Sequence, residues 1–108
     1  MSGIRYNKLV RDRIPEIIEQ SGKKCVYRAL SDDAYLVMLD QKLNEELAEY
    51  QESKSMEELA DLLEVIRAVA LARGSSIEEI EAIRRKKAAE RGGFTRKLLL
   101  VEVMDGGE

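Results

Sequence analysis

Residues 42–64 read KLNEELAEYQESKSMEELADLLE, and the acidic residues of this stretch include two pairs with the same spacing. Glu46 precedes Glu49 by three residues, and Glu58 precedes Asp61 by three. Residues three or four apart share one face of an α-helix, and the surrounding Leu, Ala, Glu and Lys are strong helix formers. The stretch therefore predicts a helix–turn–helix hairpin across which four carboxylates can converge.

The helical angle places each acidic pair along one flank of an apolar stripe. At about 100° per residue, Glu46 and Glu49 lie on one side of the leucine stripe of the first helix, and Glu58 and Asp61 lie on one side of the stripe of the second. If the stripes pack together, the acidic flanks meet. Four carboxylates at close range repel one another, and a hard divalent cation, which prefers oxygen ligands, would remove that repulsion.

Each of these acids also has an ordinary structural explanation. Ser55 and Glu58 fit a capping box, in which the Glu58 carboxylate reaches back to the Ser55 amide. Glu46 has a lysine partner one helical turn earlier. Because 36% of the residues are charged, Glu49 and Asp61 also fit as solvated surface charges. The joint spacing is more specific than any one of its members.

The two motifs ELAE (46–49) and ELAD (58–61) resemble the paired ExxE and ExxD signature of the MazG-like nucleotide pyrophosphohydrolases, a superfamily that includes phosphoribosyl-ATP pyrophosphohydrolases and dimeric dUTPases. This resemblance implies a hydrolase acting on acid anhydrides, which cleaves nucleoside triphosphates between the α- and β-phosphates to a monophosphate and pyrophosphate. It also implies a bound Mg²⁺, or Mn²⁺, held by Glu46, Glu49, Glu58 and Asp61. The sequence departs from many members in having eight residues between the two motifs, so we expect a short turn.

Two further stretches match one MazG-like subfamily. YNKLVRDRIPEII (6–18) is similar to the YNKLVRDKIPEII opening of that subfamily, and KAAERGGF (87–94) matches its K…RGGF element. The resemblance, together with the affinity of basic side chains for phosphate, makes four residues candidate substrate phosphate contacts: Lys8, Arg11, Lys87 and Arg91. The basic run at 84–87 also fits a simpler role, in which cations stabilise a helix C-terminus.

The chain contains no histidine, so a carboxylate must accept a proton if a side chain does so. Glu45 is one candidate, because the resembled motif often reads EExxE. The helical angle argues against Glu45 within one subunit, since it places this residue on the side away from Glu46. Glu49 is the alternative catalytic residue.

Length and composition favour a single domain over residues 1–108 and a mainly α fold. Together with the resemblance, they predict a MazG-like helical bundle of three to four helices, in which two long antiparallel helices form the core. Pro15 begins a short helix, and the later helices are expected at about 32–53, at 56–73 and from 77 onward. The segments 24–29 and 97–104 are expected to be strands of a small β element.

Charge and apolar patterning restrict the partners. The net charge of −3 does not favour a nucleic-acid binder, and the longest apolar run, 68–72, is too short to span a membrane. A single cysteine fits a cytoplasmic protein. The generous apolar stripes predict a homodimer, and the resemblance to the MazG-like superfamily implies a dimer or tetramer. Two alternatives to the general nucleotide hydrolase remain, namely a phosphoribosyl-ATP pyrophosphohydrolase and a non-catalytic helical dimerisation protein.

Overall fold

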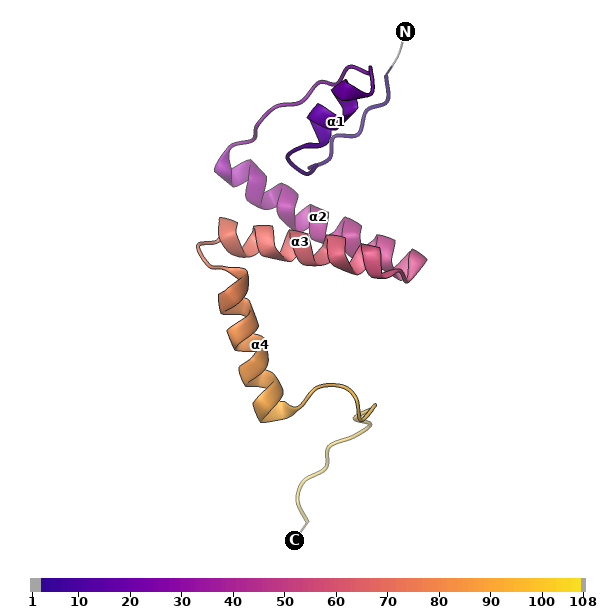
Figure 1. Cartoon of the computed structure of the whole chain (residues 1–108). Coiled ribbons are helices and arrows are strands. Elements are labelled where there is room, and N and C mark those ends of the chain that lie inside the picture. The colour runs from indigo at the N-terminus through magenta and orange to yellow at the C-terminus, as the bar shows by residue number, and fades with distance from the viewer. Residues whose placement is uncertain (1–2, 108) are drawn as a thin grey trace. The chain divides into compact units, whose positions relative to one another are not determined.

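A computed structural model describes residues 3–107 and shows a mainly α protein (Figure 1). Its helices are α1 (Ile14–Gln20), α2 (Asp32–Ser53), α3 (Met56–Ala72) and α4 (Ile77–Arg91). The chain divides into two compact units, and the boundary between them in the sequence lies between residues 77 and 78. None of the helices in the described part of the chain combines the length and apolar character needed to cross a bilayer.

Local capping explains where the two long helices begin. The side chain of Ser31 accepts a hydrogen bond from the Ala34 amide at the start of α2, and the side chain of Ser55 accepts one from the Glu58 amide at the start of α3. Such caps satisfy amides that the first turn of a helix leaves unpaired. The predicted starts of both helices are therefore confirmed.

The ends of α2 and α3 are defined by left-handed residues. Lys54 has a φ of 58°, and its amide donates to the Tyr50 carbonyl. Gly74 has a φ of 83°, and the amides of Gly74 and Ser75 donate to carbonyls of the last turn of α3, as in a Schellman motif. The link between α2 and α3 is therefore two residues long, which agrees with the short turn expected from the sequence.

The helices α2 and α3 pack side by side and form the core of the first unit (Figure 1). Its buried apolar residues are Leu39 from α2 with Val65 and Ala70 from α3. An exposed ion pair between Asp40 and Arg73 joins the open end of this hairpin, with 3.2 Å between Oδ2 and Nη2. The prediction of two long antiparallel helices is confirmed, although the core that they enclose is small.

The second unit contains almost all of α4 and the segment that follows it. No residue of α4 is buried within the described structure. Glu78 and Glu79 lie in its first turn and Arg91 in its last, so its charges are arranged as the helix macrodipole favours. The apolar side chains of 98–101, 103 and 104 are largely exposed in this single chain.

The prediction of a small β element was wrong. Residues 24–29 and 97–104 are irregular, and no strand occurs anywhere in residues 3–107. Both segments contain residues that suit strands, but a strand requires a partner that completes its hydrogen-bond ladder. An isolated pair of strands is marginal in water without further packing, and Val26 and Tyr27 are exposed rather than packed.

Leu39 should contribute most to the stability of the hairpin, because it is 2% exposed. We expect Leu39→Ala to lower the free energy of unfolding by about 2–4 kcal/mol through lost burial and a residual cavity. Urea unfolding would measure this loss. Val37→Ala, at a largely exposed position on the same helix, is the control and should change stability by less than about 0.5 kcal/mol. Equal losses in the two variants would contradict this account of the core.

Candidate metal centre

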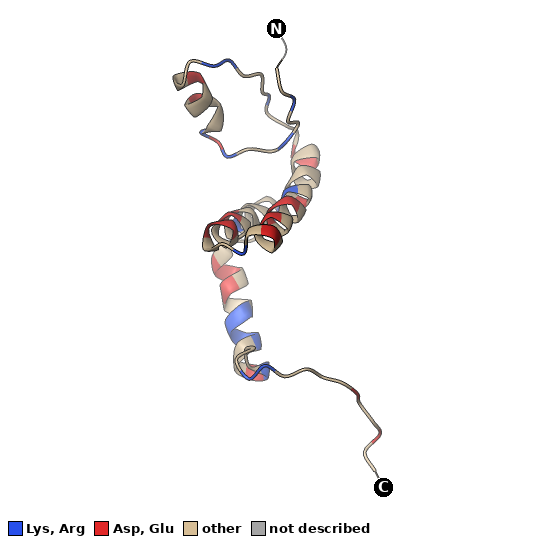
Figure 2. Ribbon diagram, turned by 90° about the vertical axis from the view of Figure 1, so that its right-hand side faces the viewer, with Lys and Arg blue, Asp and Glu red and all other residues tan. Residues whose placement is uncertain are grey.

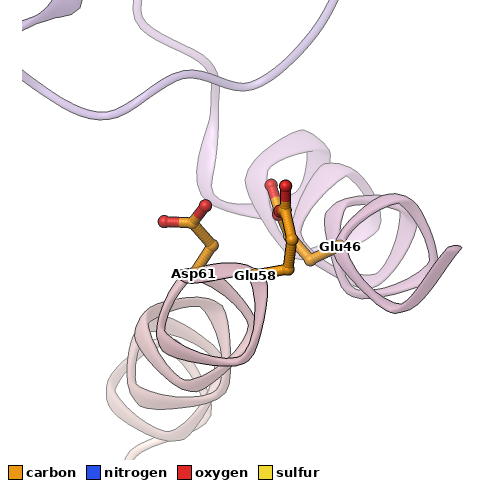
Figure 3. Close-up of side chains that lie close together, drawn as sticks. All are labelled: Glu46, Glu58 and Asp61. Carbon is orange, nitrogen blue, oxygen red and sulfur yellow. The ribbon is translucent and has the colours of Figure 1, made fainter. Parts of the chain in front are cut away.

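Three carboxylates converge across the α2–α3 hairpin (Figure 3). Glu46 comes from α2, and Glu58 and Asp61 come from successive turns of α3. One oxygen from each residue lies within 4.8 Å of the oxygens of the other two. The structure thus brings together three of the four residues that were predicted to bind a metal ion.

Glu46 is the most enclosed of these acids and is 7% exposed. Its Oε1 lies 3.5 Å from the ammonium of Lys42, while its Oε2 is buried without a hydrogen-bond partner. An unsatisfied buried oxygen is costly, and such an atom calls for a specific explanation such as an ion. The burial of this carboxylate therefore favours a ligand role over that of a solvated surface charge.

The capping-box explanation of Glu58 is only half correct. Its amide donates to Ser55 Oγ at 3.3 Å, but the Ser55 amide donates to Ser53 Oγ at 3.2 Å rather than to the Glu58 carboxylate. The Glu58 Oε2 atom is buried without a hydrogen-bond partner, and its side chain runs beside that of Glu46 (Figure 3). The backbone of this residue caps the helix while its carboxylate remains available to the cluster.

The electrostatic environment opposes charge on two of the three acids. Burial raises the pKa of Glu46 above its ordinary value of 4.5, and the neighbouring Glu49 carboxylate raises it further. Burial also raises the pKa of Glu58, with added repulsion from Glu49 and Asp61. Removal of these carboxylates from water is the main cause of the raised pKa, and repulsion from neighbouring acids adds to it; a divalent cation would oppose both effects.

The two candidate catalytic acids differ in their surroundings. Glu49 is exposed on α2 and lies outside the converging set, although its charge acts on both Glu46 and Glu58. Glu45 is also outside the set, and its Oε1 lies 3.5 Å from Lys42 Nζ and 3.7 Å from Lys8 Nζ. Lys42 Nζ lies 3.5 Å from Oε1 of both Glu45 and Glu46, so the two residues share this ammonium.

The candidate phosphate contacts divide between the two units. Lys8 and Arg11 belong to the N-terminal arm (residues 3–13), which carries basic residues, whereas the hairpin is rich in acids (Figure 2). Arg11 Nη2 lies 2.7 Å from Asp61 Oδ1, so the arm reaches the acidic cluster itself. Lys87 and Arg91 are exposed on α4, in the second unit.

The donor set fits a hard divalent cation. Carboxylate oxygens are the ligands that Mg²⁺, Mn²⁺ and Ca²⁺ prefer. Opposite ligands of Mg²⁺ stand about 4.2 Å apart, since each Mg–O distance is about 2.1 Å. Adjacent ligands stand about 3.0 Å apart in the same shell, so the three oxygens, which lie within 4.8 Å of one another, would draw closer together to share one ion, with water completing the shell.

The ion pairs around the cluster are the part of the site that sequence reasoning missed. Arg11 and Asp61 lie 50 positions apart in the sequence, farther apart than any two of the motif acids. Lys8 forms an ion pair with Glu45. A basic arm and an acidic hairpin in one chain indicate attraction between them. They do not indicate which base meets which acid.

Comparisons with known proteins assign no activity to this chain. No family model matches it, and no solved structure matches it. An uncharacterized protein of Mycolicibacterium smegmatis is 62% identical over 42 residues, which is 39% of this chain and 43% of that protein. The match thus covers less than half of either protein, and the resemblance to the MazG-like superfamily stays a prediction.

The raised pKa of Glu58 predicts how the metal-free protein responds to pH. A carboxyl whose folded pKa exceeds 4.5 stabilises the fold while it is protonated, and this contribution is lost as the pH rises through the folded pKa. Glu58→Gln keeps a neutral side chain at every pH. The melting temperature of this variant, relative to the wild type, should therefore increase between about pH 4 and pH 7 in the presence of a chelator.

Glu64→Gln is the matched control, because it removes one negative charge from an exposed position on the same helix. Its melting temperature relative to the wild type should follow pH much less strongly. The same pH trend in both variants would show that general charge on α3, and not crowding of carboxylates at the cluster, determines the behaviour of the metal-free protein.

Proposed function

We propose that this protein is a Mg²⁺-dependent nucleoside triphosphate pyrophosphohydrolase, which cleaves its substrate between the α- and β-phosphates and releases a nucleoside monophosphate and pyrophosphate. The observation that carries the proposal is the convergence of Glu46, Glu58 and Asp61 within 4.8 Å, with two buried oxygens unpartnered. House-cleaning of non-canonical nucleotides is a role that suits this activity. The likeness of the two motifs to the MazG-like signature supports the same assignment.

The chain's own residues have distinct tasks in this proposal. Glu46, Glu58 and Asp61 hold the cation, with Glu49 beside them, and the bound Mg²⁺ supplies charge neutralisation for the triphosphate and activation of water. Lys8 and Arg11 lie next to the cluster and offer positive charge to the phosphates. Lys87 and Arg91 are further candidates for the same task.

The surroundings of the two candidate bases favour Glu49 over Glu45. Glu45 is paired with two ammonium groups, from Lys8 and Lys42. Glu49 acts electrostatically on both Glu46 and Glu58 and is exposed to solvent, so a water molecule can reach it. A proton acceptor must lie within reach of the attacking water, and Glu49 meets this condition better.

The activity should appear as Mg²⁺-dependent release of pyrophosphate from a panel of canonical, oxidised and deaminated nucleoside triphosphates. Asp61→Asn and Glu58→Gln should each reduce turnover about 100-fold or more, because each removes an anionic ligand from a site that stabilises several kcal/mol of developing charge. Glu49→Gln should reduce turnover more than Glu45→Gln does.

Glu64→Gln, on α3 outside the cluster, is the control and should retain wild-type turnover. Adding phosphoribosyl-ATP to the panel separates a histidine-pathway hydrolase from a nucleoside triphosphate hydrolase. Absence of turnover for every substrate, or full activity in Asp61→Asn, would remove the proposal and leave a non-catalytic helical protein.

We also propose that the hairpin packs against a second copy of itself. Met56, Leu59 and Leu63 follow each other at intervals of three and four residues on α3 and are exposed in the single chain, which is the spacing that helices use to pack together. Leu59 and Leu63 each stand two residues from Asp61, so they lie about 200° around the helix from it. A partner covering them would leave the carboxylates open to solvent.

The apolar face predicts that the wild type elutes as a dimer or larger assembly in size-exclusion chromatography with light scattering. Leu63→Glu should shift it toward the monomer, because a charge would be buried without a partner. Leu63→Met, which keeps an apolar side chain of similar volume, is the control and should remain assembled. A wild-type monomer at concentrations of tens of micromolar would contradict this proposal.

A further inference from the structure

The N-terminal arm is tied to both helices of the hairpin at the edge of the acidic cluster. Arg11 Nη2 contacts Asp61 Oδ1 on α3 at 2.7 Å, and Lys8 Nζ lies 3.7 Å from Glu45 Oε1 on α2. The contact of Arg11 is with a residue of the second acidic motif, and the contact of Lys8 is with Glu45, which directly precedes the first. The arm therefore supplies positive charge to the site that the proposed function assigns to a cation.

Arg11 neutralises one member of the cluster in the metal-free protein. The Asp61 side chain is 42% exposed, and the guanidinium contacts it directly. Glu46 and Glu58 each keep an unpartnered oxygen. A divalent cation would meet an unpartnered oxygen on Glu46 and on Glu58, although Lys42 lies near the other oxygen of Glu46. At Asp61 it would meet a carboxylate that a guanidinium already contacts at 2.7 Å.

We propose that Arg11 exchanges its partner when the cation binds, moving from Asp61 to a phosphate group of the substrate; this inference rests on the proposed function. A cation that neutralises Asp61 weakens the attraction of this carboxylate for the guanidinium, and the cation repels the guanidinium as well. A polyphosphate held by the cation then offers Arg11 oxygens in a bidentate arrangement. The same side chain thus holds the empty site and contacts substrate in the loaded one.

The exposure of the ion pair makes this exchange accessible. The side chains of Arg11 and Asp61 are 60% and 42% exposed, and pairs of this kind shift equilibria by about fivefold or less. A buried pair would instead resist the cation strongly, because breaking it would leave an uncompensated charge. The arm can therefore compete with the cation without excluding it.

The exchange has a consequence for the order of binding. While Arg11 is paired with Asp61, it is not available to a phosphate. Once the cation has loaded, the freed guanidinium adds to phosphate affinity. Cation and phosphate should then each favour the binding of the other, since coupling between two ligands is reciprocal.

Calorimetric titration of Arg11→Gln tests the proposal with two probes. Titrated with Mg²⁺ alone, this variant should bind the ion about two- to fivefold more tightly than the wild type, because Asp61 has lost its competing partner. Titrated with inorganic pyrophosphate at saturating Mg²⁺, it should bind about tenfold more weakly or worse, because charge-assisted hydrogen bonds are lost. The opposite signs of these two changes identify partner exchange.

Two further variants complete the design. Arg13→Gln removes the same charge from the same arm, but Arg13 pairs with Glu16 at 3.1 Å and should leave both affinities within about twofold of the wild type. Arg11→Lys keeps the charge and should restore most of the wild-type Mg²⁺ affinity, while it recovers pyrophosphate binding less well because it lacks the fork.

The outcomes distinguish this inference from the function on which it rests. If Glu58→Gln abolishes Mg²⁺ binding but Arg11→Gln leaves Mg²⁺ affinity unchanged, or lowers both affinities together, partner exchange is wrong and the metal centre stands. If Arg13→Gln produces the same pair of changes as Arg11→Gln, general charge on the arm explains them and partner exchange is also wrong. If the wild type binds no Mg²⁺, both the inference and the proposed function are overturned.

Discussion

Repulsion among acids held at short range is the constraint on which the rest of this structure depends. The packing of α2 against α3 brings Glu46, Glu58 and Asp61 within 4.8 Å of one another, where like charges that are partly removed from water repel strongly. Lys42 and Arg11 relieve part of this repulsion. Burial, together with the remaining repulsion, raises the pKa of Glu46 and Glu58.

The small core makes this repulsion important for the whole hairpin. Three apolar residues are buried within the described residues. The free energy that apolar burial contributes within one chain is therefore small, and it offsets little of the repulsion among the acids. Any species that binds the folded form alone adds to its stability. A cation at the acidic edge and a second copy on the apolar face would therefore support the same pair of helices from opposite sides.

Local signals were sufficient to predict the helices, and they were not sufficient to predict strands. Ser31, Ser55 and Gly74 act through their immediate neighbours, so the sequence reveals the helix boundaries directly. The segments 24–29 and 97–104 have suitable strand residues, but strand formation depends on a distant partner that local propensity does not specify. The single-domain prediction is not tested by the division at residue 77.

The candidate site was predictable to the extent that helical geometry determines it. Spacing along each helix predicted four converging acids, and the structure brings three of them, Glu46, Glu58 and Asp61, within 4.8 Å of one another, with Glu49 outside the set. The partners of Lys8 and Arg11 were not predictable, because long flexible side chains pair according to tertiary proximity. The availability of the Glu58 carboxylate was also hidden, since it depends on Ser53 Oγ accepting a hydrogen bond from the Ser55 amide.

The two-residue link between α2 and α3 helps to determine how the acids of the two helices face each other at the candidate metal centre. Lys54 adopts a left-handed conformation and Ser55 caps the next helix, so only these two residues separate α2 from α3. One residue inserted within α3 ahead of Glu58 would rotate the acids of α3 by about 100° relative to the start of the helix, even though every side chain was retained. An insertion in the helical residues next to this turn is therefore expected to disturb the acidic cluster more than a substitution at an exposed position there.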